Sequence, residues 1–230
     1  MGTGKATAVR GMLSQFGISF IAIQETQFVE LSERIIRSFW DKSSFEFSKV
    51  NSESRSGGLL SMWNPNVFNK EQEVKSQNFI LVKGKIKGEQ EDLIIVNVYA
   101  STNQSRRRQM WDELLMLKQT IQGRWIMLGD FNEVRIPEER FNSQFYVIGA
   151  ICFNNFIRNG GFQEYNIGGK QYTFMSTDGR NLSKIDQVLV CGEFMAKWPD
   201  ASLMALNREI SDHSLLILMT TVNRFGPTPF

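Results

Sequence analysis

The chain has 230 residues, of which 42% are hydrophobic and 22% are charged. These values are typical of a globular protein and exclude disorder of the whole chain. A formal net charge of +2 excludes a protein that coats itself in nucleic acid non-specifically, but it allows positive charge to be concentrated locally.

The first half of the chain changes from helical to extended patterns. A helix with Gly17 as its C-cap is predicted before a short β-branched strand that ends next to Glu25. A second helix and three further strands follow. In chain order, these elements are expected at residues 6–16, 18–24, 32–40, 57–63, 79–87 and 93–99.

The second half begins with the clearest helix, predicted over residues 104–122. Within it, Met110, Leu114, Leu117 and Ile121 recur at every third or fourth position. Interspersed helices and strands predict an α/β protein with at least one mixed or antiparallel sheet. After the helix, we expect a strand at 125–129, a loop at 130–144, a short helix at 153–159, and strands at 171–175, 184–190, 202–206 and 215–222.

Cysteine and histidine are too few for a zinc finger or a disulfide scaffold. Cys152 and Cys191 lie in apolar surroundings, and we interpret them as reduced thiols of an intracellular protein. The N-terminal residues lack the hydrophobic core of a signal peptide, and no apolar run is long enough to span a membrane. We therefore expect a nuclear or cytoplasmic protein without a membrane partner.

Polar and acidic residues stand at or near the ends of several predicted strands. Carboxylates beside apolar strands cost free energy unless they are paired or bind a cation, and several together would suit Mg²⁺ or Mn²⁺. Each also has a plainer interpretation, because an acid after a strand often only begins a turn and a lone histidine is more often structural. The residues concerned are Glu25, Tyr99, Asp130, Asn132, Asp186, Asp212 and His213.

Five short motifs occur in one order along the chain, and this ordered set resembles the endonuclease/exonuclease/phosphatase superfamily. They are Gln-Glu-Thr at 24–26, Asn-Val-Tyr at 97–99, Gly-Asp-Phe-Asn at 129–132, Ser-Lys-Ile-Asp at 183–186 and Ser-Asp-His at 211–213. Three more features are most similar to the endonuclease domain of plant LINE-type (non-LTR) retrotransposons, in which that domain precedes a reverse transcriptase. These are Gly-Gly-Leu at 57–59, the segment 169–174, and the closing Gly-Pro-x-Pro-Phe.

The resemblance implies a DNase I-like fold, a four-layer α/β sandwich of two mixed β-sheets flanked by helices. It extends from about residue 5 to the C-terminus, which implies a domain over 1–222 and an exit segment at 223–230. The family usually opens with a strand that ends in Trp-Asn, whose asparagine helps to hold the metal. Here Met1-Gly-Thr-Gly-Lys resembles the turn after that strand, so we expect an N-terminally truncated domain that lacks its first strand.

The resemblance also implies roles for the metal and for the water that attacks the phosphate. Glu25 would be the principal Mg²⁺ ligand, with Asp212 near the metal. Asp130 would orient or deprotonate the attacking water, with Asn132 beside it.

A further set of roles concerns the phosphate itself. Asp186 would hold His213, which would contact the scissile phosphate or take part in proton transfer. Tyr99 would also contact the phosphate. A carboxylate partner raises the pKa of a histidine and fixes its tautomer, which suits this role.

The expected substrate is DNA. Arg135, Arg140 and Arg180 lie close in sequence to the proposed site and are our candidates for nucleic-acid contacts, whereas the arginines at 106–108 are at least as well explained as a solvated first helical turn. The leading hypothesis is a Mg²⁺-dependent DNA-nicking endonuclease of retrotransposon origin, once fused to a reverse transcriptase. Two alternatives stay open: an inactive or binding-only remnant of that domain, and a phosphatase or phospholipase of the same superfamily.

Overall fold

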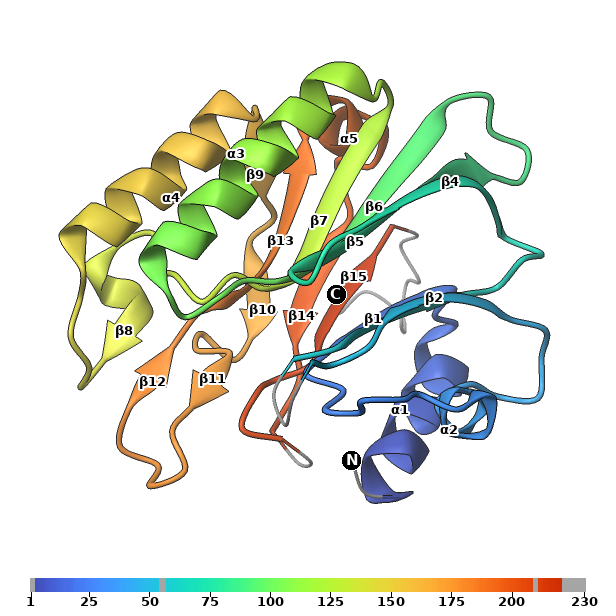
Figure 1. The fold of residues 1–230 in the computed structure, drawn as a ribbon, viewed down its shortest axis with the longest axis horizontal. Helices are drawn as coiled ribbons and strands as arrows, with labels where there is room; N and C mark the ends of the chain where they lie inside the picture. Colours follow the sequence, from blue (N-terminus) through green and yellow to red (C-terminus); the bar gives the residue numbers. More distant parts are fainter. Residues whose placement is uncertain (1–2, 54–56, 209–210, 221–230) are drawn as a thin grey trace, which may run out of the picture.

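A computed structural model describes residues 3–53, 57–208 and 211–220 (Figure 1). The expected exit segment at 223–230, and the last two residues of the strand predicted at 215–222, lie outside these ranges. Within them, no helix is both long enough and apolar enough to cross a membrane.

A six-stranded mixed sheet forms the centre of the molecule. Its order is β4-β5-β6-β7-β13-β9, and every neighbouring pair is antiparallel except β6 and β7. Those two strands can be parallel because a helix, α3 (Gln104–Thr120), carries the chain from the end of one to the start of the next. The strands are β4 (Phe68–Lys75), β5 (Phe79–Ile86), β6 (Asp92–Tyr99), β7 (Arg124–Asp130), β13 (Asp186–Cys191) and β9 (Phe162–Glu164).

Three helices cover one face of this sheet: α3 (Gln104–Thr120), α4 (Val147–Asn159) and α5 (Gly192–Lys197) (Figure 1). The contact between α3 and α4 is largely aromatic. Trp111 of α3 stacks on Phe153 and Phe156 of α4, and Phe131, just after β7, packs against Phe153. These buried rings fix the first layer of helices on the sheet.

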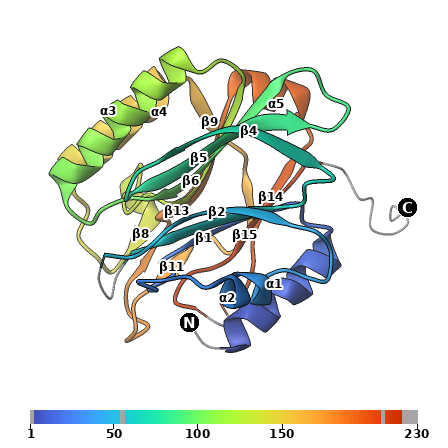
Figure 2. The ribbon, with the colours of Figure 1, turned by 45° about the vertical axis from the view of Figure 1, so that its right-hand side comes forward.

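Two three-stranded sheets lie against the opposite face (Figures 1 and 2). In the first, β1 packs against β6 and β7; in the second, β15 packs against β13, so the two sheets follow one another in a single layer. The first sheet has the order β1-β3-β2, with β1 (Phe20–Gln24), β3 (Leu59–Trp63) and β2 (Glu46–Val50). The second has the order β10-β14-β15, with β10 (Ile167–Gly169), β14 (Ser202–Ala205) and β15 (Leu216–Met219).

The fourth layer consists of α1 (Thr3–Phe16) and α2 (Glu33–Ser38), on the outer side of β1 and β3 (Figure 2). Successive residues of β3 point to opposite layers. Leu59 and Trp63 belong to the core shared with the six-stranded sheet, whereas Leu60 and Met62 belong to a second core beneath the two helices. The structure is therefore the expected four-layer α/β sandwich of the DNase I-like fold.

The second layer is interrupted between β1 and β15. Among the described residues, neither strand pairs with the other, and each has a single neighbour in its sheet. All five residues of β1 are only half-buried, although four of them are apolar. The interruption agrees with the expectation that the fold lacks one strand.

A small third sheet extends from one end of the molecule (Figure 1). It has the order β11-β12-β8, and a turn of 3-10 helix, η1 (Pro137–Glu139), leads into its edge strand. An isolated bridge joins Phe174 to His213, so this sheet reaches the strand segment that carries the histidine. Its strands are β8 (Arg140–Phe141), β11 (Phe174–Met175) and β12 (Leu182–Ser183).

The structure corrects several predicted elements. The missed strands β2, β4, β8, β9 and β10 are all edge strands, whose short, mixed or charged sequences lack the apolar pattern of a buried strand. Helix α4 begins at Val147 rather than residue 153, because its exposed apolar residues Val147, Ile148 and Ile151 hide the amphipathic period. The strand predicted at 184–190 is β13, which begins two residues later, at Asp186, and the short strand β12 lies just before the predicted range. The short helix α5 was not predicted.

Asn97 of β6 joins the two sheet layers. Its buried amide nitrogen donates hydrogen bonds to the carbonyl oxygens of Ile23 (3.3 Å) and Leu60 (3.1 Å) and to Ser61 Oγ (3.2 Å). Its amide oxygen accepts a hydrogen bond from Gln24 Nε2 at 2.6 Å. One side chain thus satisfies polar groups of both β1 and β3 inside the core.

We expect Asn97→Leu to lower the free energy of unfolding by about 3 kcal/mol or more, because each buried polar group left unpaired costs about 1–3 kcal/mol. Urea denaturation followed by circular dichroism measures the change. The matched control is Asn159→Leu, at an exposed position at the end of α4, which should change stability little. Equal stability of the Asn97→Leu protein and the wild type would contradict a structural role for this amide.

Candidate active site

Two carboxylates stand side by side at the end of the six-stranded sheet. Asp130 is the last residue of β7 and Asp186 the first of β13, and the two are directly paired in the antiparallel register. Cross-strand partners point to the same face, here toward the second layer. Both residues are buried, with 5% and 7% of their surface exposed, so their charges cannot be screened by water alone.

His213 approaches these acids from the second layer, just before β15. Its Nδ1 lies 2.8 Å from Asp186 Oδ2 and 3.0 Å from Asp186 Oδ1. The ring also packs on Phe174, with 5.0 Å between the ring centroids. The carboxylates of Asp130 and Asp186 and the imidazole offer ligand atoms that all lie within 4.8 Å of one another.

The three groups shift one another's protonation. Burial, and then the Asp186 carboxylate, raise the pKa of Asp130 to about 8, although the His213 charge acts in the opposite direction. Burial disfavours the charged imidazole, but the hydrogen bond and the charge of Asp186 outweigh it and raise the pKa of His213 to about 9. His213 is therefore positively charged at neutral pH, which is the form that stabilises an anion.

Asn132 fixes the Asp130 carboxylate. Its backbone N–H donates to Asp130 Oδ1 at 2.8 Å, and its side-chain Nδ2 donates to Asp130 Oδ2 at 3.2 Å and to the carbonyl oxygen of Ala100 at 2.7 Å. The residue adopts a left-handed backbone conformation, with φ at +50°, which asparagine tolerates better than most residues. Within the Gly-Asp-Phe-Asn turn, the asparagine side chain therefore holds the carboxylate of the aspartate two residues before it.

Tyr99 and Glu25 meet across the two layers. Tyr99 ends β6, and its hydroxyl donates a hydrogen bond to Glu25 Oε1. Burial and the Glu25 carboxylate raise the pKa of the Tyr99 hydroxyl, which stays protonated and able to donate. Glu25 follows β1 directly and has φ at +51°, so its exposed side chain turns toward the same place as Asp130.

These side chains line one open cavity of about 260 Å³. Six of the seven residues predicted at strand ends are in its wall, and the seventh, Asp186, lies immediately behind His213. The predicted residues in the wall are Glu25, Tyr99, Asp130, Asn132, Asp212 and His213.

The oxygen atoms around this cavity are the ligand type that Mg²⁺ and Mn²⁺ prefer. Asp130 belongs to the tight cluster of possible ligands, whereas Glu25 and Asp212 line the same cavity but lie outside that cluster. Because His213 Nδ1 is already bonded to Asp186, we assign the metal-binding role to the carboxylates rather than to the imidazole. The donor set fits a hard divalent cation.

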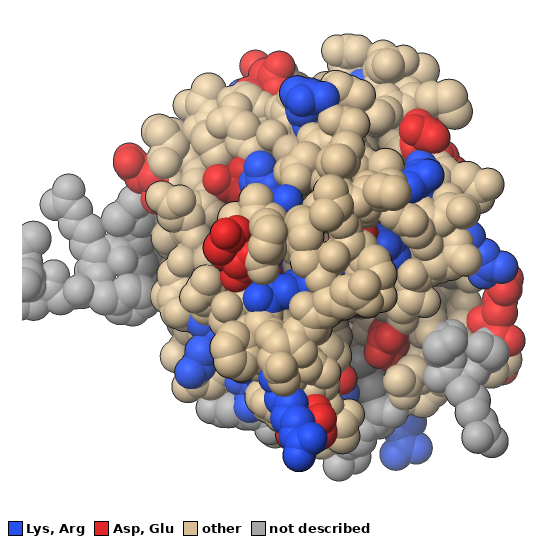
Figure 3. Space-filling view, turned by 90° about the vertical axis from the view of Figure 1, so that its left-hand side faces the viewer, with Lys and Arg blue, Asp and Glu red and all other residues tan. Residues whose placement is uncertain are grey.

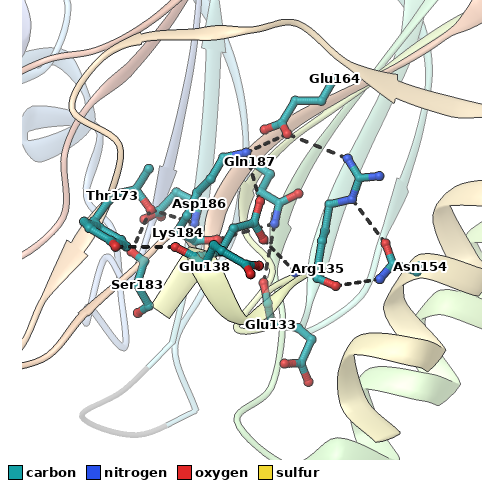
Figure 4. A network of polar contacts seen from close by, with 12 residues as sticks. Glu133, Arg135, Glu138, Asn154, Glu164, Thr173, Ser183, Lys184, Asp186 and Gln187 are labelled. Atoms are coloured by element: carbon teal, nitrogen blue, oxygen red, sulfur yellow. Dashed lines mark hydrogen bonds and ion pairs between the residues drawn. The ribbon is translucent and has the colours of Figure 1, made fainter. Parts of the chain in front are cut away.

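The three predicted arginines have different positions. Arg140 lines the cavity. Arg135 instead belongs to a neighbouring network, in which its Nε donates to Asn154 Oδ1 at 3.2 Å and its Nη1 lies 4.0 Å from Glu164 (Figure 4). Arg180 lies in the loop between β11 and β12, and its side chain is 80% exposed.

Thr173 supports the site and was not singled out from the sequence. Its Oγ1 accepts a hydrogen bond from the backbone N–H of Asp186 at 3.0 Å, and its carbonyl oxygen accepts one from Ser214 N–H at 2.6 Å (Figure 4). It therefore holds the segments on both sides of the acid–histidine pair. Its place in the segment 169–174 was a sequence signal for the family but not for this role.

Because His213 is the only histidine in the chain, its imidazole signals can be followed alone by NMR. In the metal-free protein we expect a titration midpoint near pH 9, and in Asp186→Asn a clearly lower midpoint, because the hydrogen bond and the charge that most strongly oppose the effect of burial are lost while only Asp130 and Asp212 still raise the pKa. The charged form stabilises the fold fully below pH 6.5, and this contribution is lost as the pH rises through about 9. Asp200→Asn, at an exposed turn, serves as the control; a wild-type midpoint near 6.5 would contradict the pairing.

Comparison with known proteins concerns the fold and the family of this chain. The AP endonuclease LMAP from Leishmania major is similar in structure, with a TM-score of 0.72 and 13% identity over 93% of this chain and 81% of that one. The endonuclease domain of TRAS1, a telomere-specific non-LTR retrotransposon, has a TM-score of 0.68 and 13% identity, covering 93% of this chain and 90% of the other.

A 3′ phosphatase from Neisseria, NExo, bound to a product DNA hairpin, has a TM-score of 0.67 and 14% identity, covering 93% of both chains. At these identities the similarities establish the fold. No curated protein matches in sequence. The model of the endonuclease/exonuclease/phosphatase family matches residues 2–213, and the chain belongs to that family.

Proposed function

We propose that this protein is a Mg²⁺-dependent phosphodiesterase that nicks DNA and derives from a retrotransposon endonuclease. The observation that carries the proposal is the cluster of Asp130, Asp186 and His213 at the wall of an open, oxygen-lined cavity. The structural similarity to a retrotransposon endonuclease domain supports this choice of substrate. We also propose that the domain was once fused to a reverse transcriptase and meets its substrate in the nucleus.

The cavity residues divide the chemistry of hydrolysis between them. Asp130, held by Asn132, orients a water molecule and accepts its proton as the water oxygen bonds to phosphorus and the bond to the leaving oxygen breaks. His213, kept charged by Asp186, contacts the phosphate and stabilises its developing negative charge.

Three further oxygen donors complete the proposed site. Glu25 and Asp212, together with Asp130, would hold the cation, and Tyr99 would donate a hydrogen bond to the phosphate or to Glu25. When bound, Mg²⁺ supplies positive charge that offsets both the crowded carboxylates and the charge that forms on the phosphate. The face that carries α4 and β8 shows dispersed charges of both signs rather than one basic patch, so this face offers no broad basic surface for DNA (Figure 3).

One observation favours a second candidate, a domain that binds nucleic acid without cutting it. The interruption of the second layer lies between β1, which leads into Glu25, and β15, which follows His213. Residues on its two sides must be held at fixed separation for cleavage, whereas binding tolerates more variation. The two candidates differ in a nicking assay.

We expect purified protein to nick supercoiled plasmid in Mg²⁺, and Asp130→Asn and His213→Asn each to lower the rate at least about 100-fold, the usual scale of acid–base catalysis. Conversion to the open circle, followed on agarose gels, measures the rate. Asp200→Asn, an exposed acid, is the matched control, and EDTA should abolish nicking. Nicking by all variants alike would identify a contaminant, and a folded wild type that binds DNA without nicking it would favour the second candidate.

Mg²⁺ should raise the melting temperature of the wild type, because a cation that binds only the folded state stabilises it by mass action. The shift should be smaller in Glu25→Gln and in Asp130→Asn, each of which removes a proposed ligand charge. Differential scanning fluorimetry at increasing Mg²⁺ measures it. Glu33→Gln, which changes an exposed glutamate at the start of α2, should keep the full shift; an equal shift in all variants would place the cation elsewhere.

A further inference from the structure

A single buried carboxylate lies behind the cavity wall, between two guanidinium groups. The side chain of Glu133 is only 1% exposed. Its Oε2 accepts a hydrogen bond from Arg107 Nη2 at 2.8 Å, and its Oε1 lies 3.9 Å from Arg140 Nη2. The same Oε1 accepts a hydrogen bond from the backbone N–H of Val134 at 3.2 Å. Glu133 is therefore fixed on both oxygen atoms.

Arg107 links this carboxylate to another part of the cavity wall. It projects from α3, and its Nη1 donates hydrogen bonds to the carbonyl oxygens of Ser101 (3.0 Å) and Thr102 (2.7 Å). Thr102 itself lines the cavity. The Arg107–Glu133 pair thus anchors the loop that follows β6, and it leaves the remaining side of the carboxylate to Arg140.

Arg140 is the only lysine or arginine in the cavity wall as far as the described residues show. In the small sheet it pairs with Ser183, which pairs with Phe174, and all three line the cavity because cross-strand partners share a face. The Nε atom of Arg140 is buried and has no hydrogen-bond partner among the described residues. Among the same residues, Glu133 is the only carboxylate within ion-pair distance of Arg140.

The charges of this cluster do not cancel. Two guanidiniums share one carboxylate, so one positive charge remains beside the cavity, with free donors on Arg140. Buried charges are normally paired, and a planar guanidinium pairs well with carboxylate or phosphate. A phosphate group would supply the missing negative charge.

Helix α4 leaves room for this arrangement. Gly149 lies against Glu133, and a Cβ added to the glycine would overlap with Glu133 Oε2. Any other residue would push the carboxylate away from Arg107. The absence of a side chain at this helix position is thus a second, independent sign that the position of Glu133 is constrained.

We propose that Arg140 binds a backbone phosphate of the nucleic acid and that Glu133 is the positioning residue that directs Arg140 to it. The inference rests on the proposed function for its choice of ligand. It adds a phosphate subsite and a buried support that act in binding, separate from the residues assigned to cleavage.

The test measures binding without requiring cleavage. Affinity for a fluorescent DNA duplex, with Ca²⁺ replacing Mg²⁺, is measured by anisotropy for the wild type, Glu133→Gln, Arg140→Ala and Arg140→Lys. We expect Glu133→Gln and Arg140→Ala to weaken binding about tenfold, the scale of one charge-assisted hydrogen bond, with Arg140→Lys in between. Arg140→Ala should also lower the log–log salt dependence by about one unit. In nicking assays KM should rise and kcat change less than about threefold.

A double-mutant cycle separates positioning from general damage. If Glu133 acts through Arg140, the Glu133→Gln/Arg140→Ala protein should bind DNA as Arg140→Ala does. Additive losses, or wild-type affinity in Glu133→Gln, would overturn the proposal. The control is Glu164→Gln, which removes another buried carboxylate. Glu164 Oε2 lies 2.6 Å from Lys184 Nζ, and neither residue lines the cavity (Figure 4). This variant should destabilise the fold without changing the affinity for DNA.

The outcomes also distinguish this proposal from the proposed nuclease activity. If the wild type does not nick DNA but the variants bind DNA more weakly than the wild type, the phosphate subsite is supported and the nuclease activity is rejected. If the wild type nicks DNA and every variant binds DNA with unchanged affinity, the nuclease activity is supported and the phosphate subsite is rejected. A wild type that does not bind DNA would also overturn the subsite. Should Glu133→Gln fail to fold, Gly149→Ala, which displaces the same carboxylate, should reproduce its loss of affinity.

Discussion

The geometry of the site depends on the amide of Asn97, which ties the two sheet layers together inside the core. Through it, β6 is bonded to the backbone of β1 and β3. Tyr99 stands two residues later on the same strand and therefore points to the same layer, where its hydroxyl meets Glu25, the residue after β1. A displacement of one layer along the other would break the amide's hydrogen bonds and separate this pair at the same time.

The second requirement of the fold is to keep Asp130 and Asp186 adjacent. Neighbouring buried carboxylates repel one another, and the backbone register of β7 and β13 leaves them no freedom to separate. Hydrogen-bond donors, rather than a larger separation, offset the repulsion between the two carboxylates. Asn132 bonds to Asp130, and His213 bonds to Asp186. Burial and this repulsion together raise the pKa of Asp130, and the repulsion also makes the site attractive to a cation.

Much of this site could be predicted from the sequence, because its polar and acidic residues stand directly beside apolar strands. Glu25, Tyr99 and Asp130 each stand at the end of an apolar strand, and Asp212 and His213 directly precede one. The motif order supplied the missing information, namely that these strand ends meet. The α/β class followed from the interspersed helices and strands, and the four-layer sandwich followed from the resemblance.

Other parts could not be predicted, for physical reasons. Glu133 and Asn97 act through partners far away in the sequence, and nothing in the local pattern distinguishes a buried, paired glutamate from a solvated one. Edge strands such as β2 and β4 bury few side chains and so carry no apolar period. Arg135 and Arg140 are close in sequence, yet one joins Glu164 behind the site and the other reaches the cavity, a difference decided by the path of the loop between β7 and β8.

The late position of His213 in the chain has a consequence for protein synthesis. Glu25, Tyr99 and Asp130 leave the ribosome well before the segment that carries the imidazole, and chains grow at about 5–20 residues per second. During that interval, the partly folded nascent chain holds acids without their positively charged partner. The cluster can assemble only when β15 docks on β13, so no nascent chain that ends before this strand contains the complete acid–histidine cluster.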